Sequence, residues 1–496
     1  MNSAYADGHC EIGSWGHVVG NVGGWTCDNH EGYKVLEIFL YLGASQWESF
    51  WLPGTGAPNF MDYGVGSLPL ADLDWLANTS EFPCEAPDIP SNETDAQLFG
   101  TSSTGDQIFW GAATKPLYRR PDILNQCRMV TTYYELDVHR IAQHHVLTGL
   151  TLGNARSAGT GAAIQRRARV VDPNQVLPVS YVLHSNETTV VQPATAVGAH
   201  PGFAQPVDIS ISGSNSFVDS LARNGVPSES DDLLLSLRHE FYDRMRFTGA
   251  GAPIRADQFD SYWAAAELLE NAPAMQALFA DDILVRDSNV AVCPEHPSMA
   301  GSANPSIKTK IGAAADLLGE GPARYVCAVD RGIAGTYDTH NVGGTTPTTF
   351  NVNANIYNVL HHLAENIHHP TDNPSGKIDL SDTMVVISTD FNRTPMTPNT
   401  RLDGRDHWPE GGVSVMIGGP ISGPSIEGGI DATGTTEVSS SYSPTDIRGA
   451  ILLAAGVDPF ADANYRVSDF SAALTNGGFS TEVGIRDRLK SIILGV

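Results

Sequence analysis

The chain has 496 residues, of which 41% are hydrophobic, and it carries a formal net charge of −27. This length and composition are ordinary for a globular protein with a sizeable core, built as roughly two or three average domains or as one large α/β domain with insertions. This negative charge repels the phosphate backbone of nucleic acids, and the chain has no basic stripe that would release counterions on binding. We therefore expect no nucleic-acid partner.

The sequence shows no sign of a membrane anchor. No apolar run approaches the roughly 20 residues that a transmembrane helix requires. The first 30 residues are polar and rich in Gly, His and Trp, and they contain no signal-peptide core. We therefore expect no transmembrane segment, and an exported protein would lack its leader in this chain.

Six cysteines occur along the chain: Cys10, Cys27, Cys84, Cys127, Cys293 and Cys327. None forms a CxxC pair, which argues against a zinc ribbon. An even count in an acidic, Lys-poor chain is compatible with disulfides in an oxidising compartment. Buried free thiols are an equally good interpretation, because free cysteine is among the residues most often buried.

The first half of the chain contains two predicted strands and a helix. Residues 33–42 form a short, dense apolar run of the kind found in buried parallel strands. Residues 52–127 hold many Pro, Gly and Ser and predict a loop-rich region. Residues 123–133 then predict a second strand, and residues 135–150 predict a helix closed by Gly149.

The pattern changes in the middle of the chain. Between about 214 and 290, apolar residues recur at three-to-four spacing, which predicts a helical insertion. After it, residues 323–332 predict a strand and residues 354–369 a helix. Residues 382–390 and 413–419 predict two further strands.

Strands that alternate with helices favour an α/β fold, with a mainly parallel sheet flanked by helices. Ligands of such a sheet lie beyond the carboxyl ends of its strands. We expect one domain over residues 33–496, behind a polar segment of residues 1–32.

Polar side chains gather where the predicted strands end. In "GTYDTHN", Asp338 and His340 lie two residues apart, so in an extended conformation both project from one face. Asp390 ends one predicted strand, and Asp406 and His407 precede another. Carboxylate and imidazole groups are ligands of divalent metals such as zinc or manganese, so convergence of these strand ends predicts a metal site. The alternative for any single one of them is a turn former or a solvated side chain.

These motifs carry a family resemblance. "GTYDTHN", "VVISTDFNRTP", "GRDHWP" and "VSVMIGGPISGPSIEGGIDATG", in that order, resemble the C-terminal half of the family called domain of unknown function 1501. Upstream, "KVLEIFLYLGASQWESF" resembles its opening strand and "VHRIAQHHVLTG" its His-containing helix. The resemblance covers most of residues 33–496. It implies the alkaline-phosphatase-like fold of the phosphatase and sulfatase superfamily, and a periplasmic or extracellular location.

The resemblance also implies metal ligands. In the metal-dependent phosphatases and mutases of this superfamily, one metal is held by an Asp, a nearby His and a later His, which correspond here to Asp338, His340 and His407. A second metal is held partly by an Asp-His pair. Here Asp390 is kept, but Phe391 replaces the histidine, and a phenyl ring cannot ligate a cation.

Three further positions depart from the superfamily pattern. Ser45 stands where the opening strand delivers an Asp, with Glu48 as a substitute carboxylate nearby. Sulfatases read Cys-x-Pro-Ser-Arg, three residues, then Leu-Thr-Gly; in this register His139 takes the Cys position and Gln143 the Arg position. Histidine cannot be converted to formylglycine, which argues against a formylglycine sulfatase.

The role of His139 is left open by the sequence. An imidazole there can act as a metal ligand, a general base or a nucleophile, or it can be a helix histidine packed near the core. Arg393, in the "FNRTP" loop, can clamp a tetrahedral oxyanion as a second catalytic residue, or tie its loop to the acidic surface. The histidines of "LHHLAENIHHP" are interpreted as structural, because neighbours on a helix point about 100° apart.

Two hypotheses of function follow. In the first, the protein is a metal-dependent hydrolase of phosphate or sulfate esters, acting on a small-molecule or polysaccharide ester with zinc, manganese or calcium. In the second, it is a catalytically inactive secreted relative that serves as a scaffold or binding protein. Retention of Asp338, His340 and His407 favours the first, whereas Phe391 and the missing Ser, Thr or Cys nucleophile favour the second.

Overall fold

A computed structural model describes part of the chain: residues 32–47, 49–53, 97–151, 159–171, 180–185, 190, 194, 206–210, 233, 236–238, 240, 241, 244, 307–332, 336–339, 348–395, 405–431, 433–435, 442–460, 465–471 and 481–494. Nearly all of the predicted N-terminal segment and most of the predicted helical insertion lie outside these residues. The few described positions between 233 and 244 are helical. The predicted domain boundaries stay a prediction.

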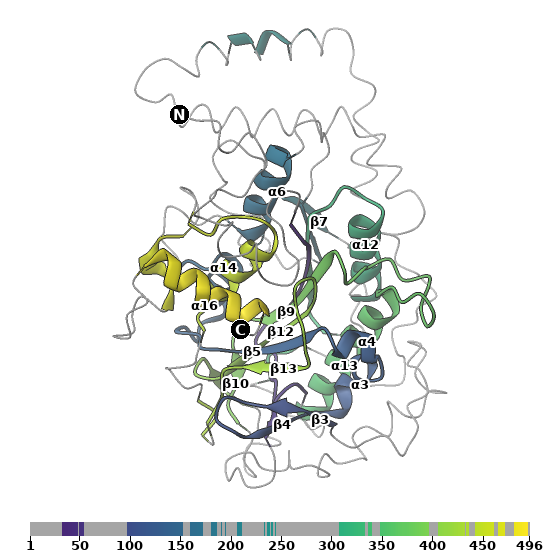
Figure 1. The fold of residues 1–496 in the computed structure, drawn as a ribbon, viewed down its shortest axis with the longest axis vertical. Helices are drawn as coiled ribbons and strands as arrows, with labels where there is room; N and C mark the ends of the chain where they lie inside the picture. Colours follow the sequence, from purple (N-terminus) through teal and green to yellow (C-terminus); the bar gives the residue numbers. More distant parts are fainter. Residues whose placement is uncertain are drawn as a thin grey trace.

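An eight-stranded sheet forms the centre of the described part, in the order β13-β5-β12-β9-β1-β8-β6-β7 (Figure 1). Every neighbouring pair is parallel except those made by β12, which runs antiparallel to β9 and β5. The predicted mainly parallel α/β fold is therefore confirmed. The strands are β1 (Lys34–Leu40), β5 (Cys127–Thr132), β6 (Ser180–His184), β7 (Val207–Ser210), β8 (Tyr325–Asp330), β9 (Thr383–Thr389), β12 (Gly412–Gly418) and β13 (Ser425–Glu427).

Helices cover both faces of this sheet (Figure 1). One face carries η4 (Ala112–Thr114), α3 (Lys115–Tyr118), α4 (Pro121–Leu124), α12 (Ile307–Gly319) and α13 (Thr348–Asn366). The other carries α5 (His139–Thr148), α6 (Thr160–Val171), α14 (Pro444–Ala454) and α16 (Glu482–Leu494), with the 3-10 turn η5 (Val467–Asp469) nearby. The predicted strands and helices outside the insertion are present, with shifts of a few residues at their ends.

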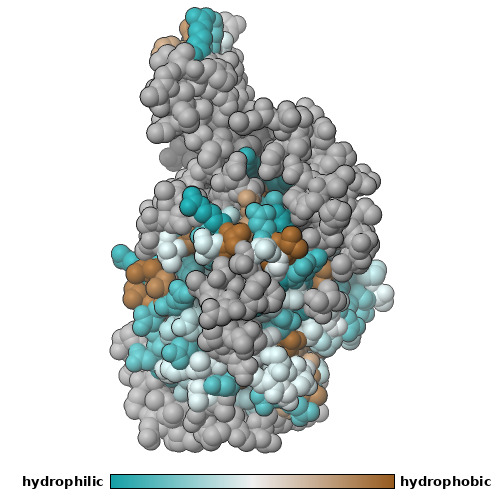
Figure 2. Space-filling view, turned by 60° about the vertical axis from the view of Figure 1, so that its left-hand side comes forward, coloured by the Kyte–Doolittle hydropathy of each residue, from teal (hydrophilic) through white to brown (hydrophobic). Residues whose placement is uncertain are grey.

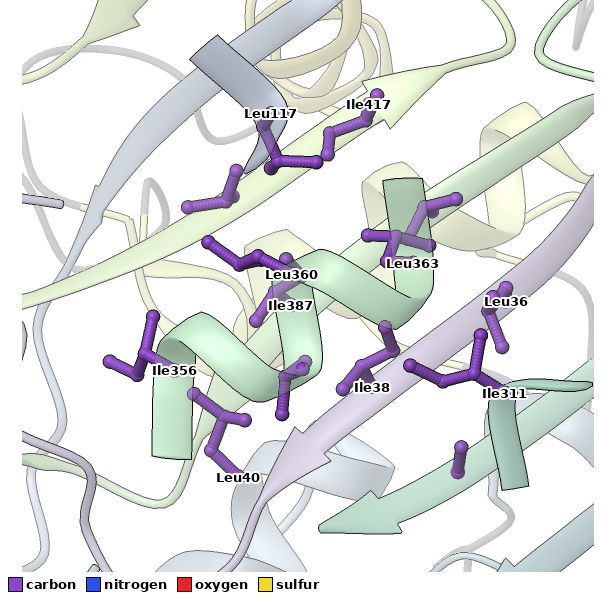
Figure 3. Close-up of a cluster of buried hydrophobic side chains, with 14 of the residues drawn as sticks. Leu36, Ile38, Leu40, Leu117, Ile311, Ile356, Leu360, Leu363, Ile387 and Ile417 are labelled. Atoms are coloured by element: carbon purple, nitrogen blue, oxygen red, sulfur yellow. The ribbon is translucent and has the colours of Figure 1, made fainter. Parts of the chain in front are cut away.

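The central strand β1 shows why its sequence is mostly apolar. Side chains alternate across a strand, so a strand covered on both faces needs apolar residues at nearly every position. Leu36, Ile38 and Leu40 point into one core, beneath α13 (Figure 3). Phe39 points into the other core, beneath α14. Every residue of β1 beyond Lys34 is buried.

The expectation of a loop-rich region over residues 52–127 is wrong for its described part. That part forms a three-stranded sheet of β2 (Leu52–Pro53), β4 (Gln107–Trp110) and β3 (Gln97–Thr101), besides the short helices named above. The sheet is anchored by Trp110, which is fully buried and stacks on Phe99 with ring centroids 4.4 Å apart. This packing of two aromatic residues is a long-range contact that the Pro, Gly and Ser content of the region does not reveal.

The two described cysteines, Cys127 and Cys327, are buried free thiols in β5 and β8. Burial raises the pKa of both thiols, and neither forms a disulfide in the described structure. The other four cysteines lie outside the described residues. The structure therefore supports the free-thiol interpretation for this pair and lends no support to a disulfide framework or to secretion.

The described surface is mixed in character. On the face in Figure 2, the hydrophobic side chains form small patches separated by hydrophilic ones. None of the helices in the described part of the chain combines the length and the apolar character that crossing a bilayer demands.

Candidate metal centre

The predicted site residues meet at one edge of the sheet because of strand direction. Asp390 directly follows β9, and Asp338 lies beyond the end of β8. His139 begins α5, which follows β5. These three strands run in the same direction, so their carboxyl ends share an edge. His407 comes from the opposite direction: it lies just before the antiparallel strand β12, which starts at that edge.

Strand alternation determines which way Asp390 points. Met384 and Val386 of β9 lie in the core under α14 and α5. Asp390 has the same parity, so its carboxylate faces the same side and meets the first turn of α5. There the Nδ1 atom of His139 lies 2.6 Å from Oδ2 of Asp390. Gln143 donates a second hydrogen bond to that oxygen, at 3.1 Å.

The contact with Asp390 assigns the tautomer of His139. Because a carboxylate accepts, Nδ1 carries the proton and donates it, which leaves the lone pair of the neutral ring on Nε2. The Nε2 atom is buried and makes no hydrogen bond to any residue that the structure describes. It lies 3.8 Å from Oδ2 of Asp338. His139 therefore presents an electron pair towards a carboxylate that is itself partly exposed.

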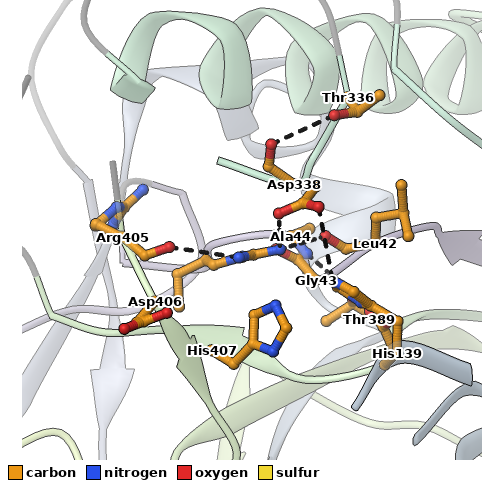
Figure 4. Close-up of polar contacts among 12 residues, drawn as sticks. Leu42, Gly43, Ala44, His139, Thr336, Asp338, Thr389, Arg405, Asp406 and His407 are labelled. Atoms are coloured by element: carbon orange, nitrogen blue, oxygen red, sulfur yellow. Dashed lines mark hydrogen bonds and ion pairs between the residues drawn. The ribbon is translucent and has the colours of Figure 1, made fainter. Parts of the chain in front are cut away.

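His407 is held in the same manner. It belongs to the short strand β11 (His407–Trp408), which pairs with β10 (Asn392–Arg393) and places His407 opposite Arg393. Its Nδ1 atom donates to the backbone carbonyl of Asp137, so that Nε2 carries the lone pair. One ligand atom from each of His139, Asp338 and His407 lies within 4.8 Å of the others. The three side chains come from different segments and converge (Figure 4).

These three side chains fit a divalent cation. Two imidazole nitrogens and one carboxylate form a ligand set of zinc and similar metals, and they leave a coordination position for water or substrate. Histidines that bind metals usually donate their other ring N–H to a carboxylate or a backbone carbonyl, which is the arrangement of His139 and His407 here. The predicted ligand His340 lies outside the described residues.

Asp390, predicted as a metal ligand, contacts the histidine instead. Its Oδ2 accepts from both His139 and Gln143, while its Oδ1 accepts from the hydroxyl of Thr389 at 3.2 Å. The side chain is fully buried. This arrangement favours a positioning role, in which Asp390 orients His139, and its role as a ligand stays a prediction.

Arg393 is fully buried, and its hydrogen bonds are internal. Nε donates to the Gly43 carbonyl at 2.9 Å, and Nη2 to the Leu42 carbonyl at 2.8 Å. Nη2 also donates to Oδ1 of Asp338 at 2.9 Å, and Nη1 reaches the Arg405 carbonyl at 3.4 Å. Burial lowers the pKa of Arg393, and attraction to Asp338 opposes that effect. The contacts favour orientation of Asp338 over the predicted clamping of an oxyanion.

Phe391 packs against both histidines of the centre. Its ring is fully buried, with its centroid 4.6 Å from that of His139 and 4.5 Å from that of His407. The ring is therefore an apolar surface against which both imidazoles pack. Ser45, at another departing position, is buried in the turn after β1, and Glu48 lies outside the described residues.

Two groups at the site were not found from the sequence. Gln143 appeared only as the residue in the sulfatase Arg position, although its i,i+4 spacing from His139 places both on one helix face. The sequence could not indicate the role of the Asp137 carbonyl, because every residue has a backbone carbonyl. Val138, between Asp137 and His139 in sequence, is 53% exposed.

A family model described as "Protein of unknown function (DUF1501)" matches residues 124–480, which include His139, Asp338 and His407. No curated protein matches the chain. Among solved structures, the PsFucS1 sulfatase from Pseudoalteromonas sp. is similar, with a TM-score of 0.34 and 12% identity. The similarity covers 87% of this chain and 69% of the sulfatase chain.

Proposed function

The chain belongs to the family described as protein of unknown function DUF1501, and we propose that it is a metal-dependent hydrolase of phosphate or sulfate esters. The observation that carries the proposal is the convergence of His139, Asp338 and His407, with ligand atoms within 4.8 Å of one another. Sequence motifs that resemble the alkaline phosphatase and sulfatase superfamily support the class of substrate. They also support a small-molecule or polysaccharide ester and a periplasmic or extracellular location.

The residues around the centre have separate tasks. A bound divalent cation supplies a Lewis acid that polarises an ester oxygen and lowers the pKa of a water molecule. Asp390 keeps the His139 lone pair on Nε2, and the Asp137 carbonyl does the same for His407. Arg393 holds one oxygen of Asp338 and leaves the other directed at His139. His139 replaces the formylglycine precursor, so the reaction proceeds without that group.

The second candidate is a catalytically inactive relative that binds without turnover. Phe391 at a ligand position favours it, because the apolar ring removes part of a second metal site. The histidine at the nucleophile position favours it as well. Retention of a metal without turnover is the result that this hypothesis predicts.

Metal content and hydrolysis test the proposal together. Purified protein is loaded with zinc, manganese or calcium, desalted and analysed for metal, then assayed with aryl phosphate and aryl sulfate esters. We expect a His139→Ala, His407→Ala variant to lose about one metal equivalent and to hydrolyse esters at least ~100-fold more slowly. His369→Gln, in the remote His369–Asp372 pair, is the matched control and retains both properties.

Unchanged metal content in the double variant contradicts the proposed centre. Loss of metal from the variant, with no turnover of either ester by the wild type, contradicts the enzyme and supports the binding protein.

A further inference from the structure

A second group of ligating side chains lies on α13, away from the candidate metal centre. His361, His362 and Glu365 occupy its last turns. Helix α13 connects β8 to β9, which are both parallel to β1, so the helix runs against the strands. Its C-terminal end therefore lies near the amino ends of the strands, at the sheet edge opposite His139 and Asp338.

The position of this group follows from what α13 buries. Leu360 and Leu363 point towards the sheet and pack among the residues of β1 and β9 (Figure 3). Because residues three and four apart share a helix face, Glu365 reaches both His361 and His362. These three side chains lie at the flank of the apolar face, where Glu365 is half exposed and His362 is buried.

The distances between the ligand atoms of His361, His362 and Glu365 are short enough for all three to bind one ion. Oε1 of Glu365 lies 3.2 Å from Nε2 of His361, and Oε2 lies 3.0 Å from Nδ1 of His362. One ligand atom from each residue lies within 4.8 Å of the others. Two ligands of a zinc ion at about 2.1 Å are separated by up to about 4.2 Å, so small side-chain rotations suffice.

One imidazole of the group is already oriented. The ring of Tyr357 stacks on His361, with planes 11° apart and centroids 6.2 Å apart. Nε2 of His361 is buried and lies 3.2 Å from Oε1 of Glu365, in an alignment too poor for a hydrogen bond. A cation between the two atoms would bond to both.

One charged group outside the cluster opposes a metal ion. Lys308 of α12 is a cation near His362, and it repels a metal ion bound there.

We propose that His361, His362 and Glu365 form a second binding site for a divalent transition metal such as zinc, separate from the candidate metal centre. Two imidazoles and one carboxylate leave room for water in the remaining position. The ion would cross-link the last two turns of α13 and bond to the buried Nε2 atom of His361. This site does not depend on the proposed hydrolase activity.

Zinc titration of a protein without the first centre tests this proposal. In a His139→Ala, His407→Ala background, isothermal titration with zinc chloride at pH 7 should show about one equivalent bound. Adding Glu365→Gln should weaken that binding at least ~10-fold, because the only anionic ligand is lost. Adding His369→Gln, which changes a neighbouring, partly exposed histidine, should leave the affinity unchanged.

Circular dichroism verifies that each variant is folded. If Glu365→Gln is unfolded, cobalt absorption in the background protein replaces it: a ligand-field band that His361→Gln abolishes supports the site. The proposal is overturned if the background protein binds no zinc, or if Glu365→Gln and His369→Gln bind it equally.

Discussion

At the scale of single residues, His139 links the candidate centre to the core. Its Nδ1 contacts the buried carboxylate of Asp390, and its Nε2 faces Asp338. Gln143, one turn later on α5, holds the same carboxylate oxygen. A histidine that binds a metal through Nε2 needs its proton on Nδ1. The hydrogen bond from His139 to Asp390 favours that tautomer in the absence of a metal ion.

Replacement of Asp390 by Asn tests the network. The new amide can donate to Nδ1 of His139 and so favour the tautomer with the proton on Nε2, which opposes ligation. We expect Asp390→Asn to weaken zinc binding at the candidate centre by about 10- to 100-fold. Competition with a chromophoric chelator measures this, in the Glu365→Gln background that lacks the second site. An unchanged affinity would show that Asp390 does not set the tautomer.

At the scale of elements, one turn and one two-stranded ribbon together hold Arg393. The turn after β1 supplies the carbonyls of Leu42 and Gly43, and the pair β10 and β11 places Arg393 beside His407. Leu42 has φ of 78° and Gly43 has φ of 71°. A left-handed conformation costs an L-residue about 1–2 kcal/mol, so the surrounding contacts must stabilise the turn at Leu42.

The packing of this turn is tested with alanine at Gly43. An added Cβ would lie 2.9 Å from the ring of Phe391 and 3.0 Å from the guanidinium of Arg393. Gly105 is the matched control, since it also has positive φ but has nothing within 4 Å of an added Cβ. We expect Gly105→Ala to lower the free energy of unfolding by about 1 kcal/mol and Gly43→Ala by about 2–4 kcal/mol.

Denaturant unfolding measures both changes, and metal affinity should fall only for Gly43→Ala because only that residue touches Arg393. Equal destabilisation by the two alanines would mean that packing at the turn is loose.

At the scale of the whole molecule, the sheet separates two cores. A histidine buried in the second core makes the free energy of unfolding depend on pH. Helix α5 presents His139 at its start and buries His145 further along. Burial, with repulsion from His144, lowers the pKa of His145 from its ordinary value of 6.5 to about 4. Between these values the unfolded chain binds a proton that the folded protein excludes. The resulting stability is present above pH 6.5 and is lost as pH falls towards 4.

Replacement of His145 by Gln should remove this acid sensitivity. We expect the free energy of unfolding of the wild type to fall by about 3 kcal/mol more than that of His145→Gln between pH 7 and pH 4. The difference between the two proteins isolates the histidine, because the large negative charge titrates equally in both. Urea unfolding at several pH values measures it, and parallel curves would refute the buried histidine as the cause.

The sequence alone predicted part of the fold, namely five of the eight strands of the central sheet and two of the helices that cover it. Periodicity located β1, β5, α5, β8, α13, β9 and β12, because a sheet covered on both faces demands dense apolar runs and its helices demand three-to-four spacing. It failed for the sheet of β2, β3 and β4, where Phe99 and Trp110 pack through long-range contacts. A window of neighbouring residues does not contain such partners.

For the site, the sequence predicted that carboxylate and imidazole side chains gather at the strand ends, because direction and alternation follow from the chain itself. Only the tertiary structure decided how Asp338, His139 and His407 combine, and that Asp390 contacts a histidine. It also decided that Arg393 is enclosed by backbone carbonyls. These contacts depend on distances between segments that are remote in sequence. The packing of the two cores sets those distances, and local sequence patterns do not encode them.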